Sequence, residues 1–294
     1  MGTSHRQAPV KNLVGSVRTG LSQLFSLPEG WEIVLGNGGS TVFWDVATFG
    51  LIESHSAHFV FGEFSSKFAE ASAAAPHLGN PTVIESAPGE HPALQAVAGA
   101  DTYALTHNET STGVAMQLSR PAGAEAGSIV TVDGTSAAGG LAWDPSKVDV
   151  YYFAPQKCFA SDGGLWIALM SPSAIYRTAQ IKATGRYIPA FLDLQTAIEN
   201  SRQNQTYNTP ALATIALMAE QIDWFNDQGG LSWCVERTRQ SSQILYSWAE
   251  NSAVASPFVS DPDLRSQVIG TIDFAESIDA AELSRQLRAN GIVD

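Results

Sequence analysis

A lysine and an aspartate follow two apolar segments that read as buried strands. Residues 129–132 form the first segment and end in Asp133, while residues 150–153 form the second and lead into a loop that carries Lys157. Their separation of 24 residues (157 − 133) is enough for one crossover between neighbouring parallel strands. A lysine amine forms a Schiff base with an aldehyde, and a carboxylate keeps a pyridine nitrogen protonated. The pair therefore favours a site for pyridoxal phosphate (PLP).

The structural alternative for each member of this pair is an ordinary one. A lysine is usually a solvated surface charge, and an aspartate after a strand is often a capping residue. The chain has five lysines (Lys11, Lys67, Lys147, Lys157 and Lys182), and among them only Lys157 follows a continuous apolar segment. A buried Asp133 without a partner would be unfavourable, whereas a pyridinium N–H would supply that partner. Both points favour the PLP site.

Three further segments place polar or aromatic residues directly after predicted strands. A glycine-rich turn at 36–41 connects a strand at 32–35 to a helix at about 42–51, and its N–H groups form a cup for a phosphate. The GK[ST] ending of a P-loop is absent from this turn. Phe64 follows a strand at 58–61, and a polar cluster at 107–113 follows a strand at 102–105. The alternatives are a plain turn, a core aromatic residue and a hydrogen-bonded loop.

Two polar loops precede predicted helices. His5 and Arg6 stand before a helix at 11–25, and residues 204–210 stand before a helix at about 211–225. Both loops have good capping chemistry, so each has a purely structural interpretation. The alternative for Arg6 is anion recognition, because a guanidinium binds carboxylate or phosphate through a bidentate fork.

Composition excludes several classes of partner and compartment. The chain has 294 residues with 44% hydrophobic and 15% charged residues, so a large core is expected. Its net charge of −13 disfavours binding to nucleic acid or to an anionic membrane. No apolar segment approaches the roughly 20 residues of a membrane span, and the N-terminus lacks the apolar core of a secretory signal. The spacing of the two cysteines indicates neither a disulfide framework nor a metal site. We therefore expect a cytoplasmic protein.

The order of predicted elements indicates an α/β fold. Strands alternate with helices, which favours a mixed, mostly parallel sheet flanked by helices. We expect a cofactor-binding large domain at 1–252 and a partial α+β small domain at 253–294. In the latter, the pattern predicts a strand at 266–274, a helix at 279–290 and the start of another strand at 291–294.

The motifs around the lysine make the chemistry more specific. Ala154, Gln156 and Lys157 precede a Gly163-Gly164 pair, with the polar cluster at 107–110 before them and Asn208-Thr209-Pro210 after them. This arrangement resembles the phosphoserine aminotransferases, which are class-V, fold-type-I PLP-dependent enzymes. The resemblance runs from Thr3 to Asp294 and is closest to the actinobacterial branch. It implies a fold-type-I large domain with an incomplete small domain.

The resemblance also implies a role for each matching residue. Lys157 would be the catalytic lysine, and His5 and Arg6 would bind the substrate. Contacts to PLP would come from Ser40, Thr41, Phe64, Thr110, Asp133, Gln156, Lys157, Asn208 and Thr209. Asn208 and Thr209 match a pair that reaches across a homodimer interface to the neighbouring subunit's cofactor phosphate. No metal is implied.

The implied reaction is a ping-pong amino transfer in serine biosynthesis. Glutamate and 3-phosphohydroxypyruvate would give 2-oxoglutarate and O-phosphoserine, and the resemblance allows a pyridoxine-pathway intermediate as a further substrate. Compared with the family pattern, Met1 replaces an N-terminal Gly-Ser-Gly-Pro segment, and the chain ends before a substrate-binding arginine. We therefore expect truncation at both ends. The alternatives are another class-V transaminase of the alanine–glyoxylate type and a catalytically incomplete PLP-binding fragment. Cysteine desulfuration is disfavoured because Cys158 adjoins the lysine and Cys234 is helical.

Overall fold

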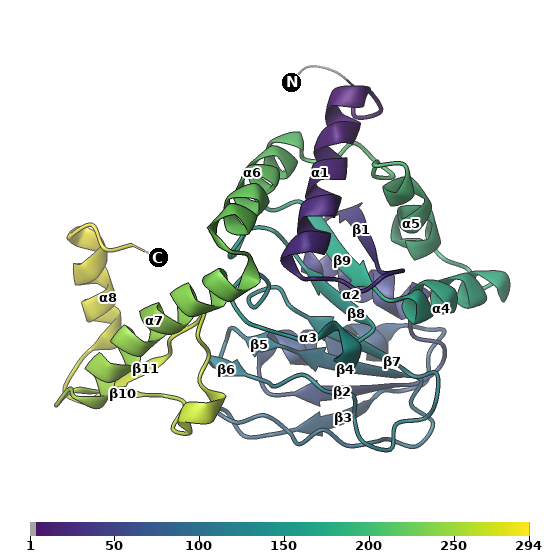
Figure 1. Cartoon of the computed structure of the whole chain (residues 1–294). Helices are drawn as coiled ribbons and strands as arrows, with labels where there is room; N and C mark the ends of the chain where they lie inside the picture. The colour runs from purple at the N-terminus through teal and green to yellow at the C-terminus, as the bar shows by residue number, and fades with distance from the viewer. Residues whose placement is uncertain (1–3, 294) are drawn as a thin grey trace.

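The computed structural model describes residues 4–293. Within them, a central sheet has seven strands in the order β1-β9-β8-β7-β4-β2-β3 (Figure 1). The strands are β1 (Glu32–Asn37), β2 (Ser56–Val60), β3 (Thr82–Glu85), β4 (Thr102–Thr106), β7 (Ile129–Asp133), β8 (Val150–Phe153) and β9 (Leu165–Met170). Only β9 runs antiparallel to its neighbours β1 and β8, so the sheet is mixed and mostly parallel, as predicted.

The middle strands are buried along their whole length. Every residue of β4, β7, β8 and β9 is buried. Strands that are covered on both faces have no solvent side, which explains why their sequences are nearly continuously apolar rather than alternating. The strand predicted at 150–153 has the same bounds as β8 in the structure.

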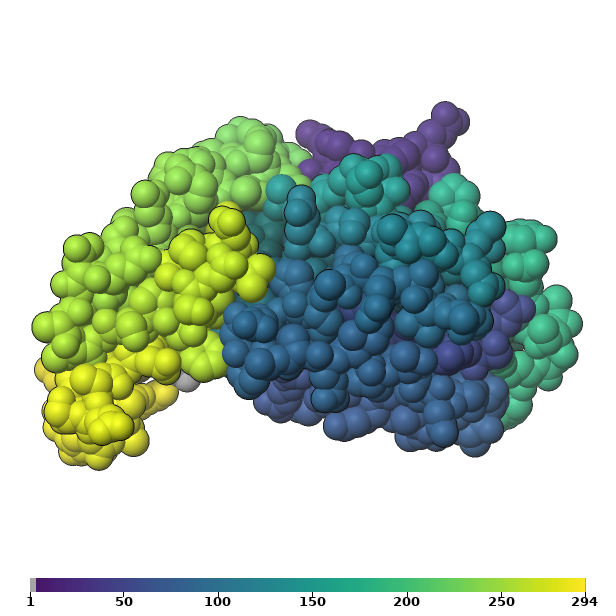
Figure 2. All heavy atoms as spheres, turned by 90° about the horizontal axis from the view of Figure 1, so that it is seen from below, coloured from purple at the N-terminus to yellow at the C-terminus, as the bar shows by residue number. Residues whose placement is uncertain are grey.

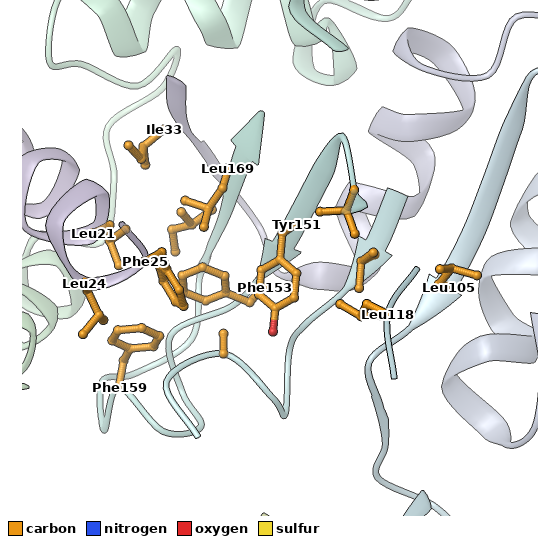
Figure 3. Packing of buried hydrophobic residues seen from close by; sticks show 14 of the residues in the cluster. Leu21, Leu24, Phe25, Ile33, Leu105, Leu118, Tyr151, Phe153, Phe159 and Leu169 are labelled. Atoms are coloured by element: carbon orange, nitrogen blue, oxygen red, sulfur yellow. The ribbon is translucent and has the colours of Figure 1, made fainter. Parts of the chain in front are cut away.

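Helices cover both faces of the sheet. On one face lie α1 (Ala8–Leu24) and α6 (Leu212–Gln228), which pack with alternate strand residues such as Tyr151, Phe153 and Leu169 (Figure 3). On the other face lie α2 (Ser40–Gly50), α3 (Glu63–Ala74), α4 (Pro172–Ala183) and α5 (Leu194–Arg202), which pack with Val150, Tyr152 and their neighbours. The buried side chains on the two faces hold the sheet in place, and the sheet in turn positions the loops at its edges.

The C-terminal part lies to one side of this sheet. It consists of α7 (Leu231–Glu250), α8 (Ala280–Ala289) and a two-stranded antiparallel sheet of β10 (Ala255–Pro257) and β11 (Ile272–Phe274). Figure 2 shows it as a yellow-green lobe beside the blue and teal body. A second small ribbon, β5 (Asn108–Glu109) with β6 (Val114–Ala115), lies between the body and this lobe. The division at residue 252 stays a prediction. Among the described residues, no helix combines the length and apolarity that a bilayer span requires.

Two predictions for the C-terminal part were wrong. The strand predicted at 266–274 is only three residues long, because the Ser266 hydroxyl accepts the N–H groups of Val268 and Ile269 and forms a local turn instead. Residues 291–293 do not begin a strand. Gly291, at φ 83°, and Ile292 donate their N–H groups to carbonyls of α8 and so terminate that helix. Asp294 lies outside the described residues.

The helix α5 was not predicted. Asp193 caps it by accepting the N–H groups of Gln195 and Thr196, and Leu194 and Ile198 bury its apolar side. The helix α2 begins at Ser40, two residues earlier than predicted. This earlier start places Ser40 and Thr41 in the first helical turn.

Candidate active site

The candidate residues gather at one edge of the sheet. Parallel strands end on the same side, so the segments that follow β1, β2, β4, β7 and β8 meet there. They enclose a cavity of about 280 Å³. Its lining is formed by Gly39, Ser40, Thr41, Trp44, Phe64, Thr106, Asn108, Thr110, Asp133, Thr135, Ser136, Gln156 and Lys157. Seven of the residues predicted from the sequence therefore share one cavity: Ser40, Thr41, Phe64, Thr110, Asp133, Gln156 and Lys157.

Asp133 is a buried carboxyl at the end of β7. One oxygen, Oδ1, accepts the Thr135 N–H at 2.8 Å, and the other, Oδ2, accepts the Tyr152 hydroxyl at 3.2 Å. Burial raises the pKa of Asp133 above its ordinary value of 3.8, and these hydrogen bonds only partly oppose the rise. A cationic donor in the cavity would therefore be bound strongly by this carboxyl.

Lys157 lies in the loop that follows β8. This loop turns tightly, with the Ala160 N–H donating to the Lys157 carbonyl and the Ser161 N–H donating to the Pro155 carbonyl. The Lys157 side chain is exposed toward the cavity, and its amine forms no hydrogen bond or ion pair with another residue between positions 4 and 293. The amine is therefore free to react with a ligand in the cavity.

The turn after β1 has the geometry of an anion-binding cup. Gly38 adopts φ 114°, a conformation that favours glycine, and its N–H donates to the Gly164 carbonyl. The helix α2 then begins at Ser40 without an acidic residue in its first turn. Because Gly39, Ser40 and Thr41 line the cavity, the positive end of the helix dipole lies beside it. The Ser40 hydroxyl lies 2.6 Å from the Thr135 hydroxyl, which brings this cup next to Asp133.

Phe64 and Thr110 line the cavity from two other elements. Phe64 is the second residue of α3 and is 36% exposed, whereas most large apolar side chains of this body are buried. Thr110 directly follows β5. An aromatic ring that stays partly exposed beside a cavity is available to stack on a planar ligand.

Four predicted residues lie outside the lining of the cavity. Within the described part of this single chain, His5 Nδ1 lies 3.1 Å from the Thr209 hydroxyl, and the Asn37 amide donates to the Thr209 carbonyl at 3.0 Å. Asn208 belongs to the same loop, and Arg6 is exposed to solvent. Since Asn37 ends β1 just before the anion cup, this cluster lies near the cavity without entering it.

Asn108 lies in the polar cluster predicted at 107–113. Sequence reasoning missed four other lining residues: Trp44, Thr106, Thr135 and Ser136. For Thr135 and Ser136 the small-residue stretch after Asp133 was a usable signal. Trp44 lies one helical turn after Ser40 on α2, a spacing that was also visible.

Unpaired polar atoms in this lining test whether PLP fits. The Trp44 indole N–H interacts electrostatically with Asp133 but makes no hydrogen bond of normal geometry to the described residues. The Asn108 Oδ1 atom is likewise buried without a partner, although the Asn108 amide donates to Ser136. Buried polar groups are normally satisfied, so unpaired ones beside a cavity point to a polar ligand. The free amine, the buried carboxyl, the anion cup and the exposed ring fit the aldehyde, pyridine nitrogen, phosphate and ring face of PLP.

Solved structures of similar fold include several transaminases. A phosphoserine aminotransferase from Cytophaga hutchinsonii superposes with a TM-score of 0.90 at 24% identity, covering 98% of this chain and 80% of that one. An alanine–glyoxylate aminotransferase from Nostoc sp. superposes with a TM-score of 0.82 at 17% identity, covering 99% of this chain and 79% of that one. At these identities the likeness shows the fold.

Sequence comparison is more specific. The family model for aminotransferase class-V matches residues 93–293. A phosphoserine aminotransferase from Nocardioides sp. is 64% identical over 295 residues, covering 100% of this chain and 79% of that protein. One from Rhodococcus jostii is 59% identical over 293 residues, covering 100% of this chain and 78% of that protein. The chain therefore belongs to the class-V aminotransferase family and, within it, groups with the phosphoserine aminotransferases.

Proposed function

We propose that this chain is a PLP-dependent phosphoserine transaminase of serine biosynthesis. It exchanges an amino group between glutamate and 3-phosphohydroxypyruvate and forms 2-oxoglutarate and O-phosphoserine. The observation that carries the proposal is that Asp133, the last residue of β7, and Lys157, in the loop after the adjacent parallel strand β8, line one cavity with Ser40 and Thr41. The names of the relatives at 59% and 64% identity support the choice of substrate.

Each lining residue has a part in this reaction. Bound PLP supplies an aldehyde that captures amines and a ring that withdraws electrons from the substrate α-carbon. The Lys157 amine would hold the cofactor between turnovers and, once freed, would act as the base that takes the α-proton from glutamate. Asp133 would hold a proton on the ring nitrogen. Ser40, Thr41 and the N-terminus of α2 bind the phosphate group.

The remaining residues exclude water and hold the substrate. Phe64 would stack on the cofactor ring, and Thr110 and Gln156 would help to hold the cofactor in the cavity. His5 and Arg6 bind the anionic end of the keto acid through charge-assisted hydrogen bonds. A second substrate from the pyridoxine pathway stays within this proposal, because its recognition would use the same residues.

We propose that the active form is a cytoplasmic homodimer. Asn208 and Thr209 do not line the cavity of their own chain, so they would not bind a cofactor in that cavity. They are positioned on an exposed loop, next to His5, and so are available to the site of a second subunit. A monomer would then have incomplete sites.

The test is a spectrum of the purified chain with PLP, recorded before and after addition of glutamate. Formation of a bound chromophore and its bleaching by glutamate would support transamination. A panel of keto acids follows, and 3-phosphohydroxypyruvate should restore the chromophore faster than pyruvate or glyoxylate. Preference for glyoxylate would favour an alanine–glyoxylate-type transaminase. Binding of PLP without bleaching would identify a catalytically incomplete protein.

A further inference from the structure

A buried carboxylate beside the cavity has no role in the mechanism above. Glu109 has 0% exposure, and none of the ion pairs within residues 4–293 involves it. A carboxylate with no counter-ion is unfavourable in a protein interior unless hydrogen bonds compensate it. The hydrogen-bond donors around the Glu109 carboxylate therefore indicate its role.

Five hydrogen bonds converge on the Glu109 carboxylate. Oε2 accepts the Ser65 N–H and the Ser65 hydroxyl, both at 2.9 Å. Oε1 accepts the Ser111 hydroxyl at 2.8 Å, and the Phe64 and Ser111 N–H groups at 3.3 Å each. Two of the five donors, the N–H groups of Phe64 and Ser65, are backbone groups in the first turn of α3.

Glu109 replaces a missing helix cap. The residue at the N-cap position of α3 is Gly62, which has no side chain to bond the free N–H groups of the first turn. A Cβ atom on Gly62 would lie 2.3 Å from Glu109 Cγ, so only glycine allows the carboxylate to approach this closely. The negative charge also lies at the positive end of the helix dipole.

This contact joins two walls of the cavity. On one wall, Phe64 is the second residue of α3 and its N–H binds Glu109 directly. On the other wall, Asn108 and Thr110 flank Glu109 in the chain and line the cavity. The distance between the aromatic ring and the polar wall is therefore set by the Glu109 carboxylate.

We propose that Glu109 is the positioning residue that holds the Phe64 ring at stacking distance over bound PLP. This inference rests on the proposed PLP chemistry of the cavity. Without the Glu109 charge, the first turn of α3 loses its cap. The Phe64 ring is then no longer held at a fixed distance from bound PLP. Ser65 supports the same arrangement, because its hydroxyl also accepts the N–H groups of Phe61 and Gly62.

The test is a double-mutant cycle on PLP affinity with Glu109→Gln and Phe64→Leu. An amide in place of the carboxylate presents N–H donors to the N–H and hydroxyl donors already there. Glu109→Gln should therefore weaken PLP binding about tenfold. In the Phe64→Leu background the same change should weaken it by less than about twofold, because the ring that Glu109 positions is gone. The visible circular dichroism of bound PLP should shrink in Glu109→Gln, because the ring face loses its fixed neighbour.

A matched control separates positioning from general loss of stability. Asp193→Asn weakens the buried cap of α5, where Asp193 accepts two N–H groups and also pairs with Lys182 but does not line the cavity. It should lower the melting temperature of the apoprotein and leave PLP affinity unchanged. A milder variant, Ser111→Ala, leaves the Glu109 carboxylate in place and removes one hydroxyl, which donates to Glu109 and accepts the Glu63 N–H of α3. It should weaken PLP binding about threefold if Glu109→Gln does not fold.

Three outcomes overturn the inference. Equal effects of Glu109→Gln, or of Ser111→Ala, with and without Phe64 would show that Glu109 does not act through the ring. An equal loss of PLP affinity in Asp193→Asn would show that any weakened cap has this effect. Absence of PLP binding by the unmodified chain would refute the proposed function as well, which distinguishes that failure from the other two.

Discussion

Asp133 and Tyr152 face each other in register on the adjacent parallel strands β7 and β8, with the Tyr152 hydroxyl 3.2 Å from the carboxyl. Tyr152 is fully buried and stacks on Phe43 of α2 at a ring-centroid distance of 4.3 Å. The carboxyl is therefore held by a rigid neighbour. Because Lys157 follows the same strand as Tyr152, this one pairing fixes the register between the carboxylate and the lysine.

The first prediction concerns Asp133. Asp133→Asn preserves the shape of the side chain but removes the charge that would hold a proton on the pyridine nitrogen. We expect the rate of the glutamate half-reaction to fall by about 10²–10³-fold, in line with the loss of one preorganised electrostatic group. Single-turnover absorbance measurements at saturating PLP report this rate directly.

The control for this variant is Asp144→Asn. Asp144 is exposed and caps a short 3₁₀ helix before β8, with the Ser146 N–H as its partner. Its substitution should leave the half-reaction within about twofold of the unmodified rate, as expected for a surface cap. Equal rates for Asp133→Asn and the unmodified chain would contradict the role given to the carboxyl.

A second prediction concerns the two lysines that flank β8. Lys157→Ala should abolish the visible absorbance of lysine-bound PLP, because the only lysine amine that lines the described cavity is removed. Lys147→Ala removes an exposed lysine ten positions earlier, before the start of β8, and this variant should bind PLP normally. A titration of each apoprotein with PLP in a spectrophotometer compares them. Retained absorbance in Lys157→Ala would exclude this residue as the attachment point.

The sequence predicted the strands better than the contacts at their ends. A continuous apolar segment bounded by turn residues defined β8 with correct bounds, because burial on both faces demands such a segment. The strand predicted at 266–274 was wrong because Ser266 offers the backbone a competing turn. Local side-chain hydrogen bonds of this kind leave no periodic signal.

In the candidate site, too, single residues were easier to predict than the contacts between distant segments. Residues in short motifs, such as Lys157 and Asp133, were predicted because each follows its own strand. Glu109 lies in the polar cluster predicted at 107–113, but its contact with Ser65 joins residues 44 apart in the sequence. The Ser40–Thr135 contact joins residues 95 apart. Such pairs depend on strand order in the sheet, which a single sequence does not specify.

A third prediction concerns the anion cup. Ser40→Ala removes a hydroxyl from the first turn of α2 and leaves Thr135 without its 2.6 Å partner. We expect PLP affinity to fall about tenfold, the usual effect of losing one hydrogen bond to a charged group. The affinity for pyridoxal, which lacks the phosphate, should change by less than about twofold. Equal losses for both ligands would place the phosphate elsewhere.

A fourth prediction concerns acid stability and two buried histidines. Burial lowers the pKa of His58 and of His107 from 6.5 to about 3. Below pH 6.5 the unfolded chain therefore binds protons on these rings that the folded chain does not bind until the pH reaches about 3. The free energy of unfolding should thus decrease as the pH falls through this window, by up to about 1.4 kcal/mol per pH unit for each histidine. Asp133 acts in the opposite direction, because its raised pKa stabilises the fold at low pH and this contribution is lost as the pH rises.

The variant His58→Gln isolates the histidine contribution, since Asp133 is unchanged and cancels in the comparison. Glutamine retains a polar group that reaches the Ser56 hydroxyl, the partner of His58 Nε2 at 2.9 Å. Denaturant unfolding of the apoprotein at several pH values between 4 and 7 gives the free energy for both chains. The slope with pH should be shallower in His58→Gln by up to about 1.4 kcal/mol per pH unit below pH 6. Identical slopes would mean that His58 titrates normally in the folded chain, against its burial between β2 and the ring of Phe68.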